Sequence, residues 1–269
     1  MAWERFELLL SPRLLVSRRK TIIRWRKGSS PARAELVEPI EVGVDWKAAV
    51  SMLEKSLVRE ARRGMRVGIT LSDLWVRFHM IQLSSTRLSE REMLSLARTH
   101  FARQYPEIGP DNLTIRLALS GSRLMAAGIE SDLLRAIEGV TERTGSKLVR
   151  IEPLFSHVFD RFEKILASAT GWILLDEPGM LTLACVEKGC LTSLHFHRCE
   201  ADQNQSALQL LERQSALLGR QLTEVRVFSV APRQIHLPAP WRIVWQQNLF
   251  EFEGRAFPTV APEPLPRRS

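Results

Sequence analysis

The chain has 269 residues, of which 45% are hydrophobic and 25% charged, and its formal net charge is +8. This composition is ordinary for a globular protein of one large or two medium domains, and it excludes a disordered chain, a collagen-like repeat and a small disulfide-rich scaffold. The three cysteines are an odd number, which is typical of free thiols in a reducing compartment, and no stretch is apolar enough to span a membrane as a helix, so we expect a cytoplasmic protein.

The positive charge is concentrated at the N-terminus. Residues 1–33 contain nine Lys or Arg against two Glu, whereas the remaining 236 residues contain 29 basic and 28 acidic side chains. Such a patch suits an anionic membrane surface, an acidic partner or nucleic acid, and a solvated hairpin explains it equally well. Trp25, between Arg24 and Arg26, is weak support for base stacking, so we expect no nucleic acid.

The first 170 residues are predicted to alternate strands with helices. Runs rich in β-branched and aromatic residues predict short antiparallel strands near the N-terminus, with a turn at Ser11-Pro12. Periodicity and capping signals then predict a helix over 45–63, a strand pair over 65–70 and 75–83, a helix over 90–104 begun by a Ser89–Glu92 capping box, a hairpin over 113–119 and 124–129, a helix over 131–145, a strand over 148–151 and a helix over 155–166.

The pattern starts again at Gly171. It predicts three antiparallel strands over 172–176, 181–187 and 191–198, a helix over 202–219, and a strand over 224–230 that returns parallel to the first. A less regular segment follows to residue 257, and the tail 258–269 has four prolines and is expected to be disordered.

One face of this second sheet is expected to lie beneath the helix over 202–219. The residues predicted to meet there are Ile173, Leu175, Leu181, Leu183, Cys185, Leu194 and Phe196 from the strands, and Ala207, Leu208, Leu211 and Leu218 from the helix.

The segment from Val67 to Leu83 and the restart at Trp172–Asp176 together resemble a known family. In the first, a strand ends at Leu71-Ser72-Asp73 and the next segment contains Trp75, Arg77 and Phe78. The pattern, over about residues 40–230, is similar to that of the actin-like cytoplasmic subunits of bacterial inner-membrane assembly platforms: the PilM-type proteins of type IV pilus systems and the cytoplasmic domain of the type II secretion L protein.

This resemblance implies an α/β protein with two ribonuclease-H-like (actin-like) lobes and mixed sheets. The N-terminal lobe is expected over 1–170 and the smaller C-terminal lobe over 171–257. The resemblance also implies a non-catalytic scaffold of a pilus or type II secretion machine, peripheral at the inner membrane through its partners. The expected partners are the cytoplasmic tail of a single-pass platform protein and an assembly ATPase; the oligomeric state is left open.

Two groups of residues are predicted to bind partners. One is the basic N-terminal strand region, which also suits an anionic membrane, and the other is the N-lobe surface around the family-like segment. The residues are Arg18, Arg19, Lys20, Arg24 and Arg26 in the first group, and Leu71, Ser72, Asp73, Trp75 and Arg77 in the second.

The phosphate-binding turns of actin-like ATPases are only partly present. Such turns need an Asp for Mg²⁺ and Gly so that backbone N–H groups can approach phosphate. The turn expected at Leu10–Arg13 has neither, and the turn Asp176–Gly179 has Pro178 and an added Glu177. We therefore expect no enzyme and no cofactor. The alternative is an ATPase of the actin and sugar-kinase fold with divergent loops, which binds ATP and Mg²⁺ through Asp176 and Gly179.

Other catalytic and metal patterns are weak. His195, His197 and Cys199 alternate along one predicted strand and share a face, but no metal-binding spacing accompanies them, so no metal site is predicted and their role is left open. Asp73 and Asp176 are too few for a two-metal nuclease, and Asp73 suits a turn that binds its own backbone.

Overall fold

The structure is a computed structural model that describes most of the chain. The described residues are 5–15, 18–27, 33–36, 46–60, 64–83, 88–177, 179–199, 203–219, 221–230 and 234–249. Side chains are described from Trp46 onward, and the predicted tail 258–269 lies outside the described residues.

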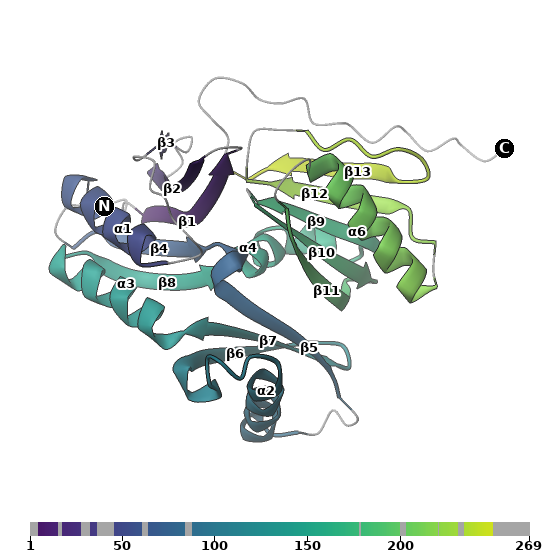
Figure 1. Ribbon diagram of the computed structural model, residues 1–269, viewed down its shortest axis with the longest axis horizontal. Coiled ribbons are helices and arrows are strands. Elements are labelled where there is room, and N and C mark those ends of the chain that lie inside the picture. Colours follow the sequence, from purple (N-terminus) through teal and green to yellow (C-terminus); the bar gives the residue numbers. More distant parts are fainter. Residues whose placement is uncertain are drawn as a thin grey trace.

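The first lobe is a mixed sheet with two helices on one face (Figure 1). Its strands, in the order β3-β2-β1-β4-β8, are β1 (Arg5–Leu15), β2 (Arg18–Lys27), β3 (Arg33–Leu36), β4 (Arg66–Leu71) and β8 (Lys147–Pro153). The first three are antiparallel to one another, whereas β4 is parallel to β1 and to β8. The helices are α1 (Trp46–Glu60) and α3 (Ser131–Arg143).

The second lobe repeats this arrangement. Its strands, in the order β11-β10-β9-β12-β13, are β9 (Gly171–Glu177), β10 (Met180–Glu187), β11 (Cys190–Arg198), β12 (Glu224–Ser229) and β13 (Arg242–Asn248). β9, β10 and β11 are antiparallel, and β12 lies parallel to β9 after the helix α6 (Gln203–Leu218). The predicted order of three antiparallel strands, a helix and a parallel return strand is therefore confirmed.

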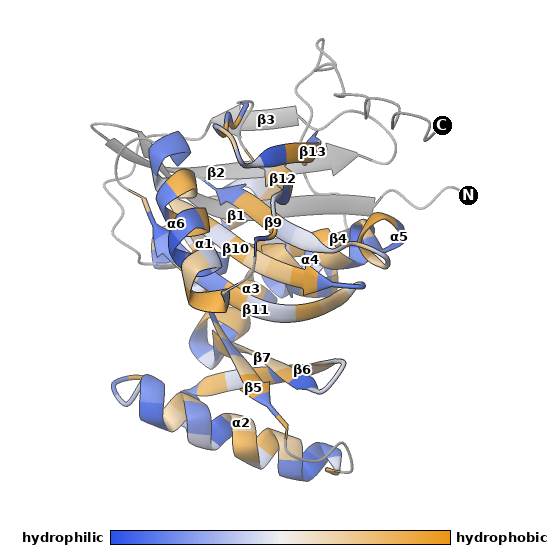
Figure 2. Cartoon of the chain, turned by 90° about the vertical axis from the view of Figure 1, so that its right-hand side faces the viewer, coloured by the Kyte–Doolittle hydropathy of each residue, from blue (hydrophilic) through white to orange (hydrophobic). Residues whose placement is uncertain are grey.

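A smaller sheet projects from the first lobe, at one end of the molecule (Figure 2). It contains β5 (Val76–Gln82), β7 (Arg123–Glu130) and β6 (Leu113–Ser120), and it is covered by α2 (Glu90–Gln104). The predicted capping box of α2 is present, with Ser89 and Glu92 bonded reciprocally. Two short helices, α4 (Leu154–Arg161) and α5 (Glu163–Leu166), connect β8 to the second lobe.

The largest hydrophobic core crosses the boundary between the lobes. It joins Leu53 of α1 and Ile69 of β4 to Ile173 of β9 and Phe228 of β12. A second core lies under α6, and a third lies between α2 and the small sheet. No helix in the described ranges is long and apolar enough to cross a membrane.

Three predicted connections differ from the structure. β1 continues through Ser11-Pro12 to Leu15, because residues 11–15 pair with β2 even though β4 ends beside Leu10. The turn expected at Leu10–Arg13 is therefore wrong. The segments around 65–71 and 75–83 belong to different sheets, and the segment after 230 contains β13, which pairs with β12.

The predicted faces of the second sheet are also partly wrong. In β9, Trp172 and Leu174 lie under α6, while Ile173 and Leu175 face the first lobe. Both faces of this strand are buried, so alternation could not distinguish them. The strand residues found under α6 as predicted are Leu181, Leu183 and Cys185; Leu194 packs on the other face, and Phe196 stacks on Phe78 of β5. From α6, Ala207 and Leu211 are buried as predicted, together with Leu210 and Gln214 in place of Leu208 and Leu218.

Gly189 offers a test of the contact between the two lobes. Its φ is +78°, and a Cβ here would lie 2.1 Å from the carbonyl oxygen of Ala167. Gly64 has a similar φ of +80° with no atom within 4 Å of such a Cβ, so Gly64→Ala is a matched control. We expect Gly64→Ala to lower the free energy of unfolding by about 1 kcal/mol and Gly189→Ala to lower it by about 1–3 kcal/mol more, measured by urea unfolding. Equal losses would contradict the close approach.

Candidate functional site

The two lobes meet through a buried polar contact, here called the inter-lobe contact, between Ser72, Asp73 and Glu177. Glu177 lies at the end of β9, and it accepts two hydrogen bonds from the segment that follows β4. Ser72 Oγ donates to Glu177 Oε2 at 2.6 Å, and the Asp73 backbone N–H donates to Glu177 Oε1 at 3.2 Å. All three residues are buried. The Glu177 side chain of the second lobe is therefore bound by the turn that follows β4 in the first lobe.

Local chemistry places Ser72 and Asp73 in this position. A short 3-10 helix, η1 (Asp73–Trp75), follows β4, and Ser72 is its N-cap because Ser72 Oγ accepts the Leu74 N–H at 3.2 Å. The Asp73 carboxyl turns the other way. Its Oδ1 accepts the Phe155 backbone N–H at 3.1 Å, in the first turn of α4. Because the N-cap residue of α4 is Pro153 and makes no side-chain cap bond, Asp73 serves as the cap of α4 from another element.

The second lobe holds its carboxyl groups with further hydrogen bonds. Gln203 of α6 donates Nε2–H to the Glu177 carbonyl oxygen at 2.7 Å. The hydroxyl of Ser229, at the end of β12, donates to Asp176 Oδ2 at 3.1 Å, and the Val230 N–H donates to the Asp176 carbonyl oxygen at 2.9 Å. Asp176 and Glu177 are both fully buried, so these bonds replace the water that their polar atoms lose.

Burial makes the inter-lobe carboxyl groups poor acids. Loss of water raises the pKa of Glu177 to about 7, and the neighbouring Asp176 charge also raises it, while the Ser72 hydroxyl and the Asp73 N–H lower it. Burial raises the pKa of Asp73 well above its ordinary value, and the nearby Glu177 charge adds to this effect. Burial of both groups therefore favours their protonated forms.

The predicted N-lobe contact residues are mostly inside the protein. Leu71, Ser72, Asp73 and Trp75 are buried, so the expectation that they form an exposed surface is corrected. β4 ends at the boundary between the lobes, and the second lobe covers the residues that follow β4. Arg77 is part-exposed: its Nη1 donates to the Leu74 carbonyl oxygen at 3.2 Å, and its guanidinium lies 5.7 Å from the centre of the Tyr105 ring. Their part in partner binding stays a prediction.

The structure says less about the other predicted residues. Arg18, Arg19, Lys20, Arg24 and Arg26 all belong to β2, whose backbone is described without its side chains. They lie on a strand of the first lobe, whereas Ser72 and Asp73 lie at the lobe boundary. Asp176 is the second-to-last residue of β9, and Gly179 lies just beyond the strand with a φ of +88°. These two residues are close in sequence at the second-lobe side of the boundary.

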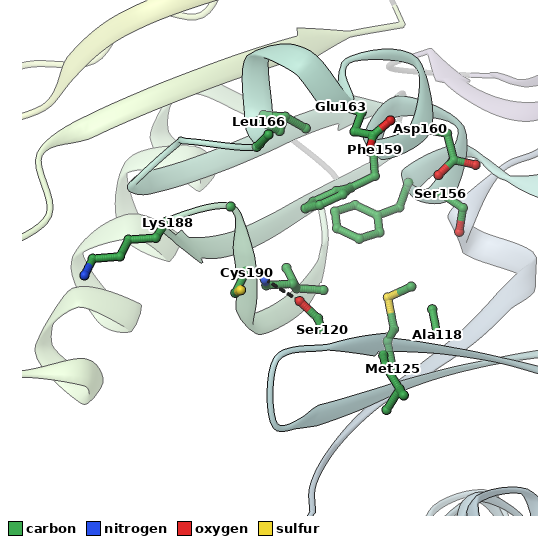
Figure 3. Close-up of a pocket in the computed structure, with 15 residues that line it drawn as sticks. Ala118, Ser120, Met125, Ser156, Phe159, Asp160, Glu163, Leu166, Lys188 and Cys190 are labelled. Carbon is green, nitrogen blue, oxygen red and sulfur yellow. Dashed lines mark hydrogen bonds between the residues drawn. The ribbon is translucent and has the colours of Figure 1, made fainter. Parts of the chain in front are cut away.

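A groove of about 580 Å³ lies next to α4 and α5 (Figure 3). Its walls come from three parts of the fold: the β6–β7 hairpin, the α4–α5 segment, and the turn between β10 and β11. The floor is apolar, and the residues that form it are Met125, Phe155, Phe159, Leu166 and Leu191. Sequence reasoning missed this groove because its walls are far apart along the chain.

The groove has different charges at its two ends. Asp160 and Glu163 stand together at one end, on α4 and α5, and Lys188 lies at the other end on the β10–β11 turn (Figure 3). Leu119 on the rim is 59% exposed, which is high for a leucine and extends the apolar surface outward. Cys190 lines the groove and is the exposed cysteine among the described residues; Cys185 and Cys199 are buried.

The alternating histidines belong to the α6 side of the second sheet. His195 pairs with Leu183 and His197 with Leu181, and both leucines lie in the core under α6. Burial lowers the pKa of His195, and the Arg213 charge on α6 adds to this effect. Within the residues that the structure describes, no three His, Cys, Asp or Glu side chains are grouped so that they could hold a metal ion.

Comparison with solved structures identifies the fold. The chain is similar to the PilM–PilN type IV pilus biogenesis complex, with 14% identity, coverage of 84% of this chain and 80% of that chain, and a TM-score of 0.58. It is also similar to the cytoplasmic domain of EpsL, an inner-membrane component of the type II secretion system of Vibrio cholerae, with 14% identity, coverage of 88% and 87%, and a TM-score of 0.52. No protein-family model and no curated protein matches the sequence.

A third similar structure also has an actin-like fold. It is a protein of Bacteroides thetaiotaomicron with an actin-like ATPase fold and unknown function, with 14% identity, coverage of 84% and 81%, and a TM-score of 0.49. The predicted fold class, two ribonuclease-H-like (actin-like) lobes with mixed sheets, is confirmed, and so is the resemblance to the actin-like components of pilus and type II secretion systems.

The raised pKa of Glu177 predicts how stability depends on pH. Between about pH 4.5 and 7 the folded state holds a proton that an unfolded glutamate has lost, so the free energy of unfolding falls as pH rises. For Glu177 alone the fall is on the order of 3 kcal/mol, and Asp73 acts in the same direction. We expect urea unfolding from pH 5 to 8 to show this fall in the native chain and a smaller one in Glu177→Gln. The exposed Glu212 on α6 supplies the control Glu212→Gln, and an equal fall in all three proteins would contradict the assignment.

Proposed function

We propose that this protein is a non-catalytic scaffold of a pilus or type II secretion-like assembly platform, and that its groove binds the cytoplasmic tail of a single-pass inner-membrane protein. The observation on which the proposal rests is the groove itself. Its floor is apolar, its acidic end lies on α4 and α5, and its walls come from both lobes and the small sheet. Such a groove suits an extended peptide with an apolar anchor.

The charge of the groove favours a basic tail. Cytoplasmic segments that flank a membrane helix are rich in Lys and Arg. A basic side chain next to an apolar anchor can approach Asp160 and Glu163 while the anchor contacts Phe159 on the floor.

The comparisons support the proposal at the level of the fold. One similar structure is a PilM–PilN complex and another is an inner-membrane component of a secretion system. We propose the same setting for this chain: the cytoplasmic side of an inner membrane, with attachment through partners. The basic residues of β2 would then face either anionic lipid or an assembly ATPase.

The boundary between the lobes supports a non-catalytic role. In an ATPase of this fold, the turn after β9 would receive phosphate and its Asp would organise Mg²⁺. Here Glu177 is bound by Ser72 and Asp73, and Asp176 accepts a bond from Ser229. These carboxyl groups are hydrogen-bonded within the fold and fully buried. The alternative, an ATPase with divergent loops, requires the lobes to separate at this contact before nucleotide can enter.

We expect no ATP hydrolysis above background and no thermal shift with Mg-ATP. A ligand at 100 times its dissociation constant stabilises a protein by about 2.7 kcal/mol, which a thermal melt detects. The matched variant is Asp176→Asn. Hydrolysis by the native chain that Asp176→Asn abolishes would overturn the non-catalytic scaffold in favour of the ATPase.

We expect the groove to bind a basic peptide with an apolar anchor. The probe is a fluorescent, acetylated 12-residue peptide with a Leu-Phe pair beside two arginines, and its binding is measured by anisotropy. Replacing Asp160 and Glu163 by Lys should weaken binding about tenfold or more, which is about 1.4 kcal/mol, because attraction becomes repulsion.

The control makes the same change of charge elsewhere. Glu138 and Glu212 are exposed on the outer helices α3 and α6, so Glu138→Lys with Glu212→Lys alters the net charge equally and should leave the affinity within about twofold. A peptide with two glutamates in place of the arginines should bind the native groove more weakly. Equal loss in both double variants would show a general charge effect and contradict the groove.

A further inference from the structure

The Ser72-Asp73 dipeptide connects the second lobe to the groove. On one side, the Ser72 hydroxyl and the Asp73 N–H bind the Glu177 carboxylate. On the other side, the Asp73 carboxyl accepts the N–H of Phe155, which is the second residue of α4 and lines the groove. A movement of Glu177 therefore reaches the floor of the groove through two adjacent residues.

The shape of the groove also depends on how the lobes are placed. The turn between β10 and β11 forms its second-lobe wall, and Leu191 of that wall donates its N–H to Ser120 Oγ of the small sheet at 2.7 Å. The Gly189 N–H donates to the Ala169 carbonyl oxygen at 2.9 Å, and the ring of Phe196 stacks on Phe78 with centroids 5.1 Å apart. These contacts hold the second-lobe wall of the groove against the small sheet and the segment that follows α5.

We propose that the inter-lobe contact is a proton-controlled latch that couples the placement of the lobes to the affinity of the groove. The part that concerns the groove's ligand rests on the proposed function, whereas the latch itself does not. With a proton on Asp73 or on Glu177, the contact between Ser72, Asp73 and Glu177 forms. When that proton is lost, two adjacent buried carboxylates repel each other, and the lobes separate at this point.

The surroundings of the latch contain acids that reinforce this effect. Among the residues whose side chains are described, Glu177 raises the pKa of Asp73, Asp176 raises the pKa of Glu177, and no basic side chain acts on either group. The Ser72 hydroxyl donates to the Glu177 carboxylate and the Ser229 hydroxyl to the Asp176 carboxylate, whereas Gln203 donates to the backbone carbonyl oxygen of Glu177. His157 on α4 is bonded instead to Glu152, with its Nδ1 2.5 Å from Glu152 Oε1. Loss of the proton is therefore opposed by the neighbouring acids.

The latch is tested first without any ligand. In the full-length, ¹⁵N-labelled chain, the Phe155 amide is followed by NMR from pH 5 to 9, because an amide bonded to a carboxyl group senses its ionisation. We expect this amide to titrate near neutral pH, to stop titrating in Asp73→Asn, and to titrate at lower pH in Glu177→Gln, which removes the neighbouring charge. The control Glu212→Gln should titrate as the native chain does. A Phe155 amide that does not titrate, or that titrates identically in Glu177→Gln, overturns the latch.

The coupling is tested with the same basic Leu-Phe peptide. Its arginines keep their charge over this range, so a change of affinity reports on the protein. We expect the native chain to bind the peptide at least threefold more weakly at pH 8 than at pH 6, and Glu177→Gln to bind equally at both. If Phe155 titrates while the native affinity stays constant, the coupling is wrong.

A third readout separates failure of the latch from failure of the proposed function. If the peptide binds at neither pH, the proposed tail site fails, and hydrogen exchange of the Phe159 and Leu191 amides then decides the latch. After correction for the intrinsic rate, faster exchange at pH 8 in the native chain but not in Glu177→Gln supports the latch. Unchanged exchange in both proteins overturns it.

Discussion

The sheet of the second lobe is apolar on both faces, and the architecture follows from the need to cover both. Every residue of β9 is buried, and so are all but the last of β10. One face lies under α6, with Trp172 and Leu174 in contact with that core. The other face, with Ile173 and Leu175, packs against the first lobe in a core shared by the two halves of the chain. No described helix of the second lobe covers this second face, so the first lobe covers it instead.

The shared core also encloses polar groups at the ends of two strands. Where β4 and β9 end, backbone and carboxyl groups are enclosed with the apolar side chains and lose their water. Ser72, Asp73 and Glu177 satisfy one another across the boundary, and Asp73 also completes the first turn of α4. The same burial raises the pKa values of both acids, which is the basis of the proposed latch.

The inter-lobe contact and the groove differ in whether a ligand can reach them. In an actin-like fold the boundary between the lobes is where a nucleotide would lie, and here that boundary is occupied by side chains of the protein itself. The open surface is displaced to the neighbouring groove, whose apolar floor and acidic end suit a peptide rather than a phosphate. This division agrees with the scaffold role that we propose.

Local signals in the sequence determined the order and type of most elements. Period and capping located α2, whose Ser89–Glu92 box is present, and turn residues located the β6–β7 and β9–β10 hairpins. The repeated order of three strands, a helix and a parallel strand was visible because each step depends on residues near one another in the chain. The restart at Gly171 likewise indicated the second lobe.

Only the tertiary structure decided which faces are covered and where a site can form. Alternation could not tell the two faces of β9 apart, because both are apolar, and it placed Ile173 and Leu175 under α6 instead of against the first lobe. Leu71 and Trp75 were expected at the surface, since nothing local shows that the second lobe covers them. The groove brings together residues 118–125, 155–167 and 188–191, and the contact of Asp73 with Glu177 spans 104 positions. Sequence patterns report local periodicity, whereas burial and the pKa values that result from it depend on which distant segments exclude water from one another.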